Sequence, residues 1–346
     1  MGKKNRHILI AVAAISLVTA LYFLAGGAKQ VEGDSGHRLV MGTFARVVAI
    51  AADSKIVDRA IEAAISEIQS VDTLMSDYKS DSEISQVNKD GFTRAVAVSE
   101  PTYEVLEKSI EFSKLTGGAF DITVGPLVDL WHSAGKMGVP PSEEQLAAAK
   151  AKVGFEKLIL DDQQRTVRFA VEGMRLDLGG IAKGYAVDKA IEAMRKAGAV
   201  GGMVDIGGDL RCFGKAPPGK KVWRIGLQDP RLKTDESKSD LLLILQLASG
   251  AVATSGDYRQ FVLIDGRKYG HVIDRQTGTG AEDLSSVTVI AESATDADAL
   301  ATAVSVMGAQ KGLALIEKMP GTEAILITSQ PKYELIKTSG AEKYIK

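Results

Sequence analysis

The stretch RLDLGGIAKGYAVDKA, residues 175–190, predicts a strand, a glycine turn and a helix in immediate succession. The strand covers Met174 to Leu178 and carries Asp177, the turn is Gly179-Gly180, and Lys183 lies in the first turn of the helix. Glycines let other groups approach the backbone closely, and the first N–H groups of a helix lack internal partners. Together with the helix dipole and Lys183, such a turn suits a phosphate. A tight turn in a packed core, with Asp177 as a cap, explains the same residues equally well.

Outward from this stretch, short strands and amphipathic helices follow one another without a steady strand–helix–strand rhythm. Before it, the sequence predicts a strand at 38–51 with a break at 41–43, helices at 56–75, 100–116 and 143–152, a polar loop at 76–88, a strand within 119–131 and a hairpin at 158–169. After it come a helix at 181–197, strands at 203–206, 210–213, 222–227, 241–247, 251–255 and 287–290, a hairpin around Asp265-Gly266 and a helix at 294–307. This mixture predicts an α+β fold, with helices packed on mixed sheets in two closely associated subdomains.

The composition narrows the classes of function. The chain has 346 residues and a net charge of −2, which gives no electrostatic footprint for nucleic acid. Cys212 is the only cysteine, so neither an intramolecular disulfide nor a thiolate metal cluster can form. Because the chain has four histidines, a hard cation held by oxygen atoms is a better expectation than a multi-histidine zinc site.

The N-terminus carries a targeting signal. Lys3, Lys4 and Arg6 precede an apolar run from Ile8 to Ala28, which is about long enough to span a bilayer. Residues 1–28 are therefore predicted to be a signal peptide or a retained signal anchor, 29–37 a linker, and 38–346 the working domain. We expect that domain on the periplasmic side of the bacterial inner membrane.

A second group of polar residues lies in TDADALAT, residues 295–302. Asp298 and Thr302 lie one helical turn apart on one face, and a carboxylate and a hydroxyl suit Mg²⁺, with a backbone carbonyl of the Gly179-Gly180 turn as a third ligand. Alternatively, these residues only cap the helix and complement its dipole. His271 can relay a proton near neutral pH, although a lone histidine is more often an ordinary surface or core residue.

Seven motifs, in this order, resemble the FAD:protein FMN transferases, the ApbE family. They are MGT at 41–43, SEIS at 82–85, FDITVGPLV at 120–128, DLGGIAKGYAVD at 177–188, TSGDYRQF at 254–261, HVIDRQTG at 271–278 and DADALATAVSVMG at 296–308. The set spans nearly all of the exported part, from Leu39 to about Ile327. The chain departs from the family pattern at Arg275, where proline is common, and at Asp209, where asparagine is common. The resemblance implies an ApbE-like, T-fold-like architecture.

The resemblance also implies a Mg²⁺-dependent enzyme that splits FAD, attaches FMN through a phosphoester to a threonine or serine of a partner protein, and releases AMP. Asp298, Thr302 and the carbonyl of Gly180 would hold Mg²⁺. The acceptor's proton would go to Asp177 or His271, and the sequence does not decide between them. Carried over by position, the residues that contact FAD would be Met41, Tyr78, Ala119, Phe120, Asp121, Asp177, Lys183 and Ile273.

The implied acceptor is a flavoprotein subunit of a membrane electron-transport complex, of the Na⁺-translocating NADH:quinone reductase or RNF type, or a periplasmic reductase. Two other functions fit the same residues. A periplasmic FAD pyrophosphatase would let water take the place of the acceptor and would release FMN and AMP. A non-catalytic protein of the cell envelope would bind FAD without turnover.

Overall fold

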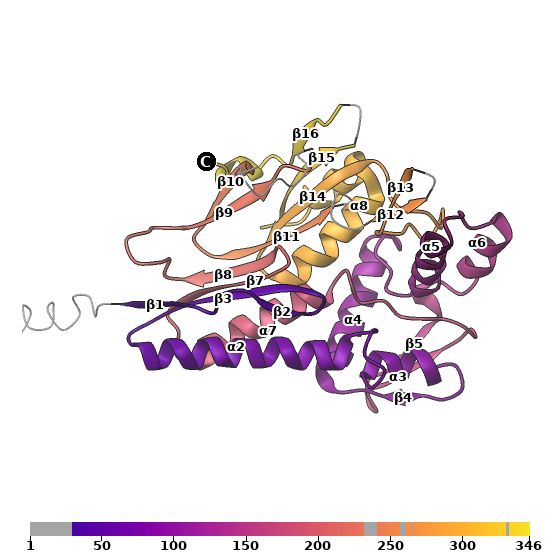
Figure 1. The fold of residues 1–346 in the computed structure, drawn as a ribbon, viewed down its shortest axis with the longest axis horizontal. Coiled ribbons are helices and arrows are strands. Elements are labelled where there is room, and N and C mark those ends of the chain that lie inside the picture. The colour runs from indigo at the N-terminus through magenta and orange to yellow at the C-terminus, as the bar shows by residue number, and fades with distance from the viewer. Residues whose placement is uncertain (1–29, 232–240, 257–260, 265, 330–331) are drawn as a thin grey trace, which may run out of the picture.

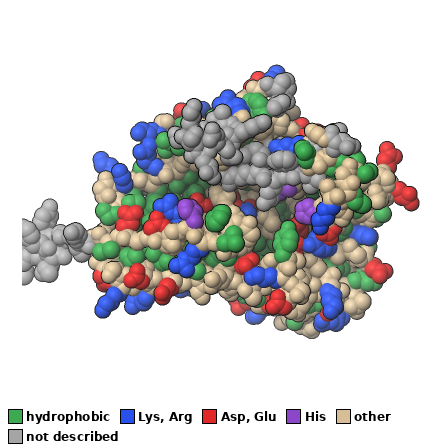
Figure 2. All heavy atoms as spheres, in the orientation of Figure 1, with side chains coloured by type: hydrophobic (Ala, Val, Ile, Leu, Met, Phe, Trp, Pro, Cys, Tyr) green, Lys and Arg blue, Asp and Glu red, His purple; other side chains and the backbone are tan. Residues whose placement is uncertain are grey.

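The computed structural model describes residues 30–346 except 232–240, 257–260, 265 and 330–331 (Figure 1). It confirms the α+β fold: an antiparallel sheet carries helices on one face and a small hairpin sheet on the other, and a mostly helical region lies beside this sandwich. The predicted signal segment, residues 1–28, lies outside the described residues. On the face shown in Figure 2, positive and negative side chains are interspersed, and no basic patch gathers among the described atoms.

In the described part of the chain, the main sheet has nine strands. Their order is β1-β3-β7-β8-β11-β14-β15-β16, with β2 also pairing with β3, and all these pairings are antiparallel. The strands are β1 (Val31–Asp34), β2 (Arg38–Val40), β3 (Thr43–Ala51), β7 (Gly201–Ile206), β8 (Asp209–Gly214), β11 (Gly250–Gly256), β14 (Leu284–Ala291), β15 (Glu323–Thr328) and β16 (Leu335–Lys337). The predicted break at 41–43 is confirmed as the β2–β3 turn, where Met41 has a φ of 50°.

The segment 29–37, predicted as a linker, contains strand β1 and is therefore part of the sheet. Residues of β1 pair with β3 from Val31–Ala51 to Asp34–Val48. A Cβ at Gly33 would lie 2.2 Å from Val57 Cγ1, so the missing side chain lets the neighbouring helix pack against the strand. The four residues are too few, and too polar, for strand periodicity to be recognised from the sequence.

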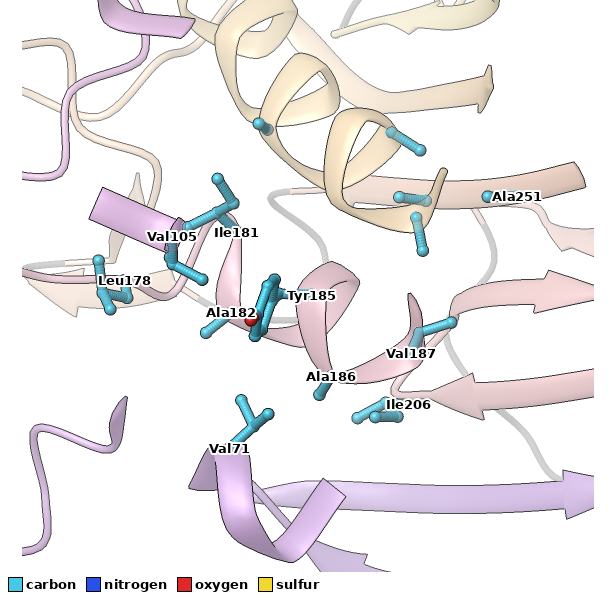
Figure 3. Close-up of a cluster of buried hydrophobic side chains, with 14 of the residues drawn as sticks. Val71, Val105, Leu178, Ile181, Ala182, Tyr185, Ala186, Val187, Ile206 and Ala251 are labelled. Atoms are coloured by element: carbon cyan, nitrogen blue, oxygen red, sulfur yellow. The ribbon is translucent and has the colours of Figure 1, made fainter. Parts of the chain in front are cut away.

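Three helices cover one face of the sheet: α2 (Ser54–Met75), α7 (Ala182–Lys196) and α8 (Ala294–Ile316). Figure 3 shows Val71 of α2, Tyr185 of α7 and Ile206 of β7 in one buried cluster, which is the burial that their apolar spacing predicts. The predicted end of the last helix at Met307 coincides with a kink, because Gly308 has a φ of 75° before the helix continues. Within the described residues α8 alone is long and apolar enough to cross a membrane, and 50% of its apolar window is buried inside the protein.

A two-stranded sheet, β9 (Trp223–Gln228) and β10 (Leu241–Leu247), covers the opposite face. Strand residues of the main sheet that point away from the helices, such as Val48 and Val252, pack against Trp223 and Leu245 in a second core. The last described element, the short 3₁₀ helix η2 (Ala341–Tyr344), packs against this side as well. The sandwich is therefore three layers thick, and its helical layer holds α7 and α8.

The region between α2 and α7 forms a mostly helical body beside the sandwich (Figure 1). We call residues 76–180 the inserted region. Its elements are α3 (Glu83–Asp90), β4 (Val96–Ala97), α4 (Glu100–Leu115), α5 (Gly125–Met137), α6 (Glu143–Lys150), η1 (Phe155–Lys157), β5 (Leu158–Asp161) and β6 (Thr166–Phe169). The predicted helices at 100–116 and 143–152 and the hairpin at 158–169 are confirmed.

Two predictions in the inserted region are wrong. The first fails because apolar residues are sparse, and the second fails because a proline taken as the end of a strand lies in the first turn of a helix. The polar segment 76–88, predicted as a loop, contains the start of α3, which is capped by Ser82 and buries Ile84 and Val87. The segment 119–131, predicted as a strand ending at Gly125-Pro126, instead begins helix α5 there. Proline suits the first turn of a helix because its missing N–H would have no partner in that turn anyway.

The strand predicted at 174–178 is also wrong. This segment runs extended but makes a single parallel bridge, between Arg175 and Val124. The side chain of Asn88 takes the place of a neighbouring strand: its Oδ1 accepts from Leu176 N at 2.7 Å, and its Nδ2 donates to Leu176 O at 3.1 Å. The glycine turn and α7 follow as predicted, so the anion-site geometry does not depend on a regular strand.

The predicted hairpin around Asp265-Gly266 is confirmed as β12 (Phe261–Ile264) and β13 (Arg267–Gly270), although Asp265 itself lies outside the described residues. The hairpin packs on α5, not on the main sheet. Trp131 stacks on Tyr269 with ring centroids 4.6 Å apart, and its Nε1 donates to Gly278 O at 2.7 Å. Residues 271–280, which we call the 271–280 loop, therefore belong structurally to the inserted region.

Candidate active site

Helices α7 and α8 cross close to their N-terminal ends, and Gly184 makes this approach possible. A Cβ at Gly184 would lie 2.2 Å from Ala294 O. One turn further along α7, Asp188 accepts hydrogen bonds from Ala294 N and Thr295 N, both at 2.9 Å, and from Thr295 Oγ1 at 2.6 Å. Arg211 of β8 pairs with the same carboxylate at 2.7 Å. Asp188 thus caps α8 from another helix and fixes the two helix starts relative to each other.

Lys183, in the first turn of α7, lies between two buried carboxylates. Its Nζ donates to Asp209 Oδ2 and lies 3.5 Å from Asp298 Oδ1. Asp298 Oδ2 also accepts from Gly184 N at 3.0 Å. Burial raises the pKa of Asp298 to about 7, with Lys183 opposing the shift and Asp209 adding to it. Burial lowers the pKa of Lys183, but the two carboxylates outweigh it and raise that pKa above its ordinary value.

The glycine turn before α7 meets the face of α8 that carries Thr302. A Cβ at Gly180 would lie 2.9 Å from Thr302 Oγ1, and this hydroxyl lies 3.5 Å from Ser255 Oγ of β11. Gly180, Lys183, Asp298 and Thr302, which are distant in sequence, are therefore brought together. The oxygen groups gathered here, a buried carboxylate, hydroxyls and a glycine backbone, are the donors that a hard cation prefers. In the described parts of the chain no three His, Cys, Asp or Glu side chains cluster as metal ligands, so a cation would depend on hydroxyl and carbonyl oxygens here.

Asp177 lies at the border between the glycine turn and the inserted region. Its Oδ1 accepts from Gly179 N at 2.8 Å, so it does brace the turn, and its backbone N donates to Ile122 O at 2.8 Å. Burial raises the pKa of Asp177 above its ordinary value. Nearby, Arg175 pairs with Asp77 at 2.5 Å. Tyr78, which follows Asp77 in the chain, is 87% exposed.

The segment Ala119–Asp121 directly precedes Ile122, whose carbonyl accepts from Asp177 N, and it is buried except at Ala119. Phe120 packs edge-on against Phe112 of α4. Asp121 accepts from Thr123 N at 2.8 Å, Thr123 Oγ1 at 2.6 Å, Phe155 N at 3.0 Å and Arg275 Nη1 at 2.9 Å. Four donors use the capacity of this carboxylate, so Asp121 holds the local backbone together.

The remaining predicted residues lie at two edges of this region. Met41 is half-buried in the β2–β3 turn, where the neighbouring Thr43 packs against Gly207 of the β7–β8 turn. Ile273 is buried with Trp131 against α5, and the half-buried His271 directly follows β13. The α7–α8 cluster and Asp177 thus lie at the start of α7, and the pairing of Arg275 with Asp121 joins the 271–280 loop to the 119–121 segment.

Comparison with known proteins gives a family for this arrangement. The sequence model of the ApbE family matches residues 41–326. The chain belongs to the ApbE family. A relative from Vibrio cholerae serotype O1, named FAD:protein FMN transferase, is 35% identical over 90% of this chain and 91% of its own length. The protein of the same name from Escherichia coli K12 is 32% identical over 93% of each chain.

Solved structures agree with this family and with the fold. The crystal structure of the ApbE protein from Thermotoga maritima has a TM-score of 0.79 at 32% identity, covering 92% of this chain and 100% of its own. The structure of the flavin transferase ApbE from Vibrio cholerae has a TM-score of 0.76 at 32% identity and covers 91% and 99%. Since the chain and these proteins match over nearly their whole lengths, the ApbE architecture extends across both the sandwich and the inserted region.

For three residues of this ApbE site, the sequence alone did not predict a role. Asp209 follows the paired glycines of the β7–β8 turn, and it pairs with Lys183 and accepts from Thr254 N at 3.2 Å. Asp188 caps α8, and its only local signal is a lone carboxylate on the buried side of α7. Arg275 points into the inserted region, where it pairs with Asp121 and Glu156. For Asp209 and Arg275, departure from the family pattern was the only available signal.

Proposed function

We propose that this chain is a Mg²⁺-dependent FAD:protein FMN transferase, which moves FMN from FAD to a threonine or serine hydroxyl of a partner protein and releases AMP. The observation that carries the proposal is the meeting of the Gly180 turn, Lys183, Asp298 and Thr302 at the start of α7. A helix start, an ammonium and oxygen ligands together suit a diphosphate. The names of the relatives at 32–35% identity support the same chemistry.

The reaction needs positioning and charge neutralisation more than covalent chemistry from the protein. The acceptor oxygen bonds to the phosphorus on the FMN side of the FAD diphosphate, and the bond from that phosphorus to the bridging oxygen breaks. AMP leaves with the bridging oxygen, and the hydroxyl proton passes to a base. Lys183 and the positive end of the α7 dipole bind and orient the diphosphate.

The oxygen donors at the α7–α8 crossing fit a magnesium ion. The carboxylate of Asp298, the hydroxyl of Thr302 and the carbonyl of Gly180 would hold it, and Gly180 allows the contact because a side chain there would strike Thr302. When bound, the ion would supply neutralising charge for the diphosphate. Asp209 would hold Lys183 in the site even when Asp298 binds the ion, because Lys183 Nζ also donates to Asp209.

Two groups are candidates for the base. Asp177 braces the glycine turn, and burial raises its pKa toward the range in which a carboxylate accepts a proton efficiently. His271 lies on the 271–280 loop, which the inserted region holds beside residues 119–121. The pH dependence of kcat in Asp177→Asn and His271→Gln variants separates them, since removal of the base abolishes the acidic limb of the profile.

The acceptor and the location follow from the N-terminal pattern and the family. We propose an acceptor subunit of a membrane electron-transport complex, of the Na⁺-translocating NADH:quinone reductase or RNF type, or a periplasmic reductase. The apolar run that follows Lys3, Lys4 and Arg6 would place the working domain on the periplasmic side of the inner membrane.

The decisive experiment incubates the protein with FAD, Mg²⁺ and a purified acceptor subunit, with and without a chelator. We expect a covalent FMN adduct by mass spectrometry and one AMP per adduct, both abolished by the chelator. Asp298→Ala should lower the rate by about 10² to 10³, whereas Asp296→Ala on the same helix should leave it within a factor of about three. Free FMN with AMP and an unmodified acceptor would mean a pyrophosphatase, and FAD binding without any AMP would mean a binding protein.

A further inference from the structure

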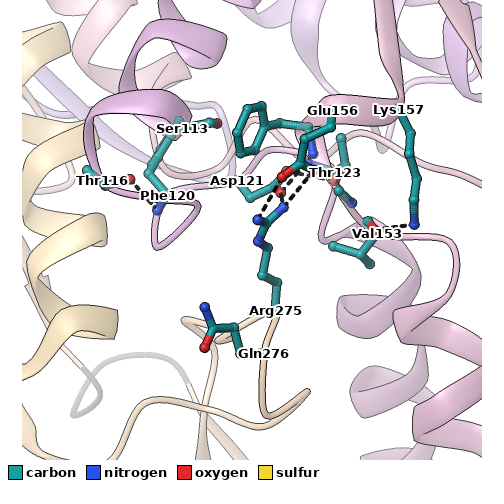
Figure 4. A network of polar contacts seen from close by, with 12 residues as sticks. Ser113, Thr116, Phe120, Asp121, Thr123, Val153, Glu156, Lys157, Arg275 and Gln276 are labelled. Carbon is teal, nitrogen blue, oxygen red and sulfur yellow. Dashed lines mark hydrogen bonds and ion pairs between the residues drawn. The ribbon is translucent and has the colours of Figure 1, made fainter.

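Arg275 joins the 271–280 loop to the inserted region through both terminal nitrogens of its guanidinium group and through the face of that group (Figure 4). Its Nη1 donates to Asp121 Oδ2 at 2.9 Å and to Glu156 Oε2 at 3.0 Å, and its Nη2 donates to Glu156 Oε1 at 2.9 Å. The guanidinium also lies over the ring of Phe155, 5.1 Å from its centroid. A Cβ at Gly118 would lie 2.5 Å from the guanidinium carbon, so this glycine leaves the space that Arg275 fills. We call Arg275, Asp121 and Glu156 the clasp.

The members of the clasp are held with unequal strength. The Asp121 side chain is fully buried and keeps three other donors, from Thr123 and Phe155, when Arg275 is removed. The Glu156 side chain is 55% exposed, so its pairing with Arg275 is screened by water. Asp121 is therefore the fixed end of the clasp, and Arg275 is the end that follows the loop.

The clasp connects residues 119–121 of the inserted region with the 271–280 loop. Residues 119–121 directly precede Ile122, whose carbonyl accepts from Asp177 N at 2.8 Å, and the 271–280 loop carries His271 and Ile273. The second polar attachment of the loop, from Trp131 to Gly278 O, lies three residues beyond Arg275. Removing Arg275 would break the ion pairs that join the middle of the loop to Asp121 and Glu156.

We propose that Arg275 is a positioning residue, which holds the 271–280 loop at one fixed spacing from residues 119–121. The inference rests on the proposed function and deepens it, because the residues held in place are those predicted to contact the flavin dinucleotide and to take the acceptor's proton. Without the clasp, the loop samples several positions, so that residues 119–121 contact FAD without a fixed contact from the 271–280 loop. In this proposal Arg275 acts through the residues that it holds, because its head group pairs with Asp121 and Glu156.

The test compares the full-length protein with Arg275→Ala, Arg275→Lys and Glu156→Gln, and uses Arg168→Ala as the matched control. Arg168 is an exposed arginine on β6 of the same region. Hydrogen–deuterium exchange with mass spectrometry reports on the backbone of residues 271–280, and quenching of flavin fluorescence reports the Kd for FAD. In Arg275→Ala we expect exchange in the loop to be about tenfold faster and the Kd about tenfold higher, because a hydrogen bond between charged groups is lost.

The variants make the outcome decisive. Glu156→Gln retains the Asp121 pairing and should change exchange by no more than about threefold, and Arg275→Lys should recover part of the FAD affinity. Equal exchange in Arg275→Ala and Arg168→Ala would overturn the clasp. Faster exchange with unchanged FAD affinity would overturn the positioning role. Both readouts work without transfer, so a failure of the transferase assay leaves this test intact.

Discussion

The most direct test of the site's architecture is the removal of Asp188, the carboxylate by which α7 caps α8. The change Asp188→Ala leaves two buried backbone donors, Ala294 N and Thr295 N, without their acceptor. It also leaves Arg211, whose side chain is 18% exposed, without its partner. The local cap of α8 remains, because Ser293 Oγ accepts from Asp296 N at 3.1 Å.

The two caps should differ in magnitude because they differ in burial and charge. Each unsatisfied buried donor costs about 1–3 kcal/mol, and breaking a buried charge pair costs about 3–5 kcal/mol in total, so we expect Asp188→Ala to lower the free energy of unfolding by about 4 kcal/mol. Ser293→Ala removes one partly buried cap bond to a neutral hydroxyl and should cost about 1 kcal/mol. Because Asp298 lies in the first turns of α8, the Asp188 variant should also lose the thermal stabilisation that we expect from the proposed Mg²⁺ site.

Urea unfolding followed by far-UV circular dichroism measures both variants against the parent protein at one pH. A second measurement records the melting temperature with and without Mg²⁺. The reasoning is refuted when Asp188→Ala costs no more than Ser293→Ala, because the tertiary cap would then contribute nothing beyond the local one. It is equally refuted when Mg²⁺ stabilises Asp188→Ala as much as the parent protein.

Three further outcomes follow from single contacts. Gly184→Ala should lower the free energy of unfolding by about 1–3 kcal/mol in urea titrations, despite the roughly 1 kcal/mol by which alanine favours a helix, because its Cβ would strike Ala294 O. Burial raises the pKa of Cys212 to about 12, so iodoacetamide at pH 8 should leave the folded protein unmodified and alkylate it fully in urea, as mass spectrometry would show; modification without urea would contradict the burial. The hydrogen bond from Arg275 lowers the pKa of Glu156 below the ordinary 4.5, so its stabilisation is present above that pH and is lost as the pH falls through the lowered pKa. Glu156→Gln should therefore cost up to about 1 kcal/mol at pH 7 and nothing at pH 2.5, measured by urea unfolding at both pH values.

The elements that the sequence predicts correctly are those with a long apolar face or a distinctive turn. The spacing in α2 and α7 and the Asp-Gly hairpin each reflect an interaction between residues that are near in the chain, so a local pattern contains the whole signal. Two short elements were predicted wrongly because their local pattern contains too little of that signal. Helix α3 buries two apolar residues, and the 174–178 segment is paired by the Asn88 side chain, which lies far away in sequence.

By itself, the sequence determined that a glycine turn precedes a helix with Lys183 in its first turn, and that Asp298 and Thr302 share one face of an apolar helix. It also determined the family, through seven motifs in order. Tertiary packing sets three contacts that no local pattern contains: Gly180 lies against Thr302, Lys183 is shared by Asp209 and Asp298, and Arg275 turns inward. Periodicity reveals which side of an element is buried, but the partner of a buried charge depends on which elements cross there, and that depends on the packing of the whole chain.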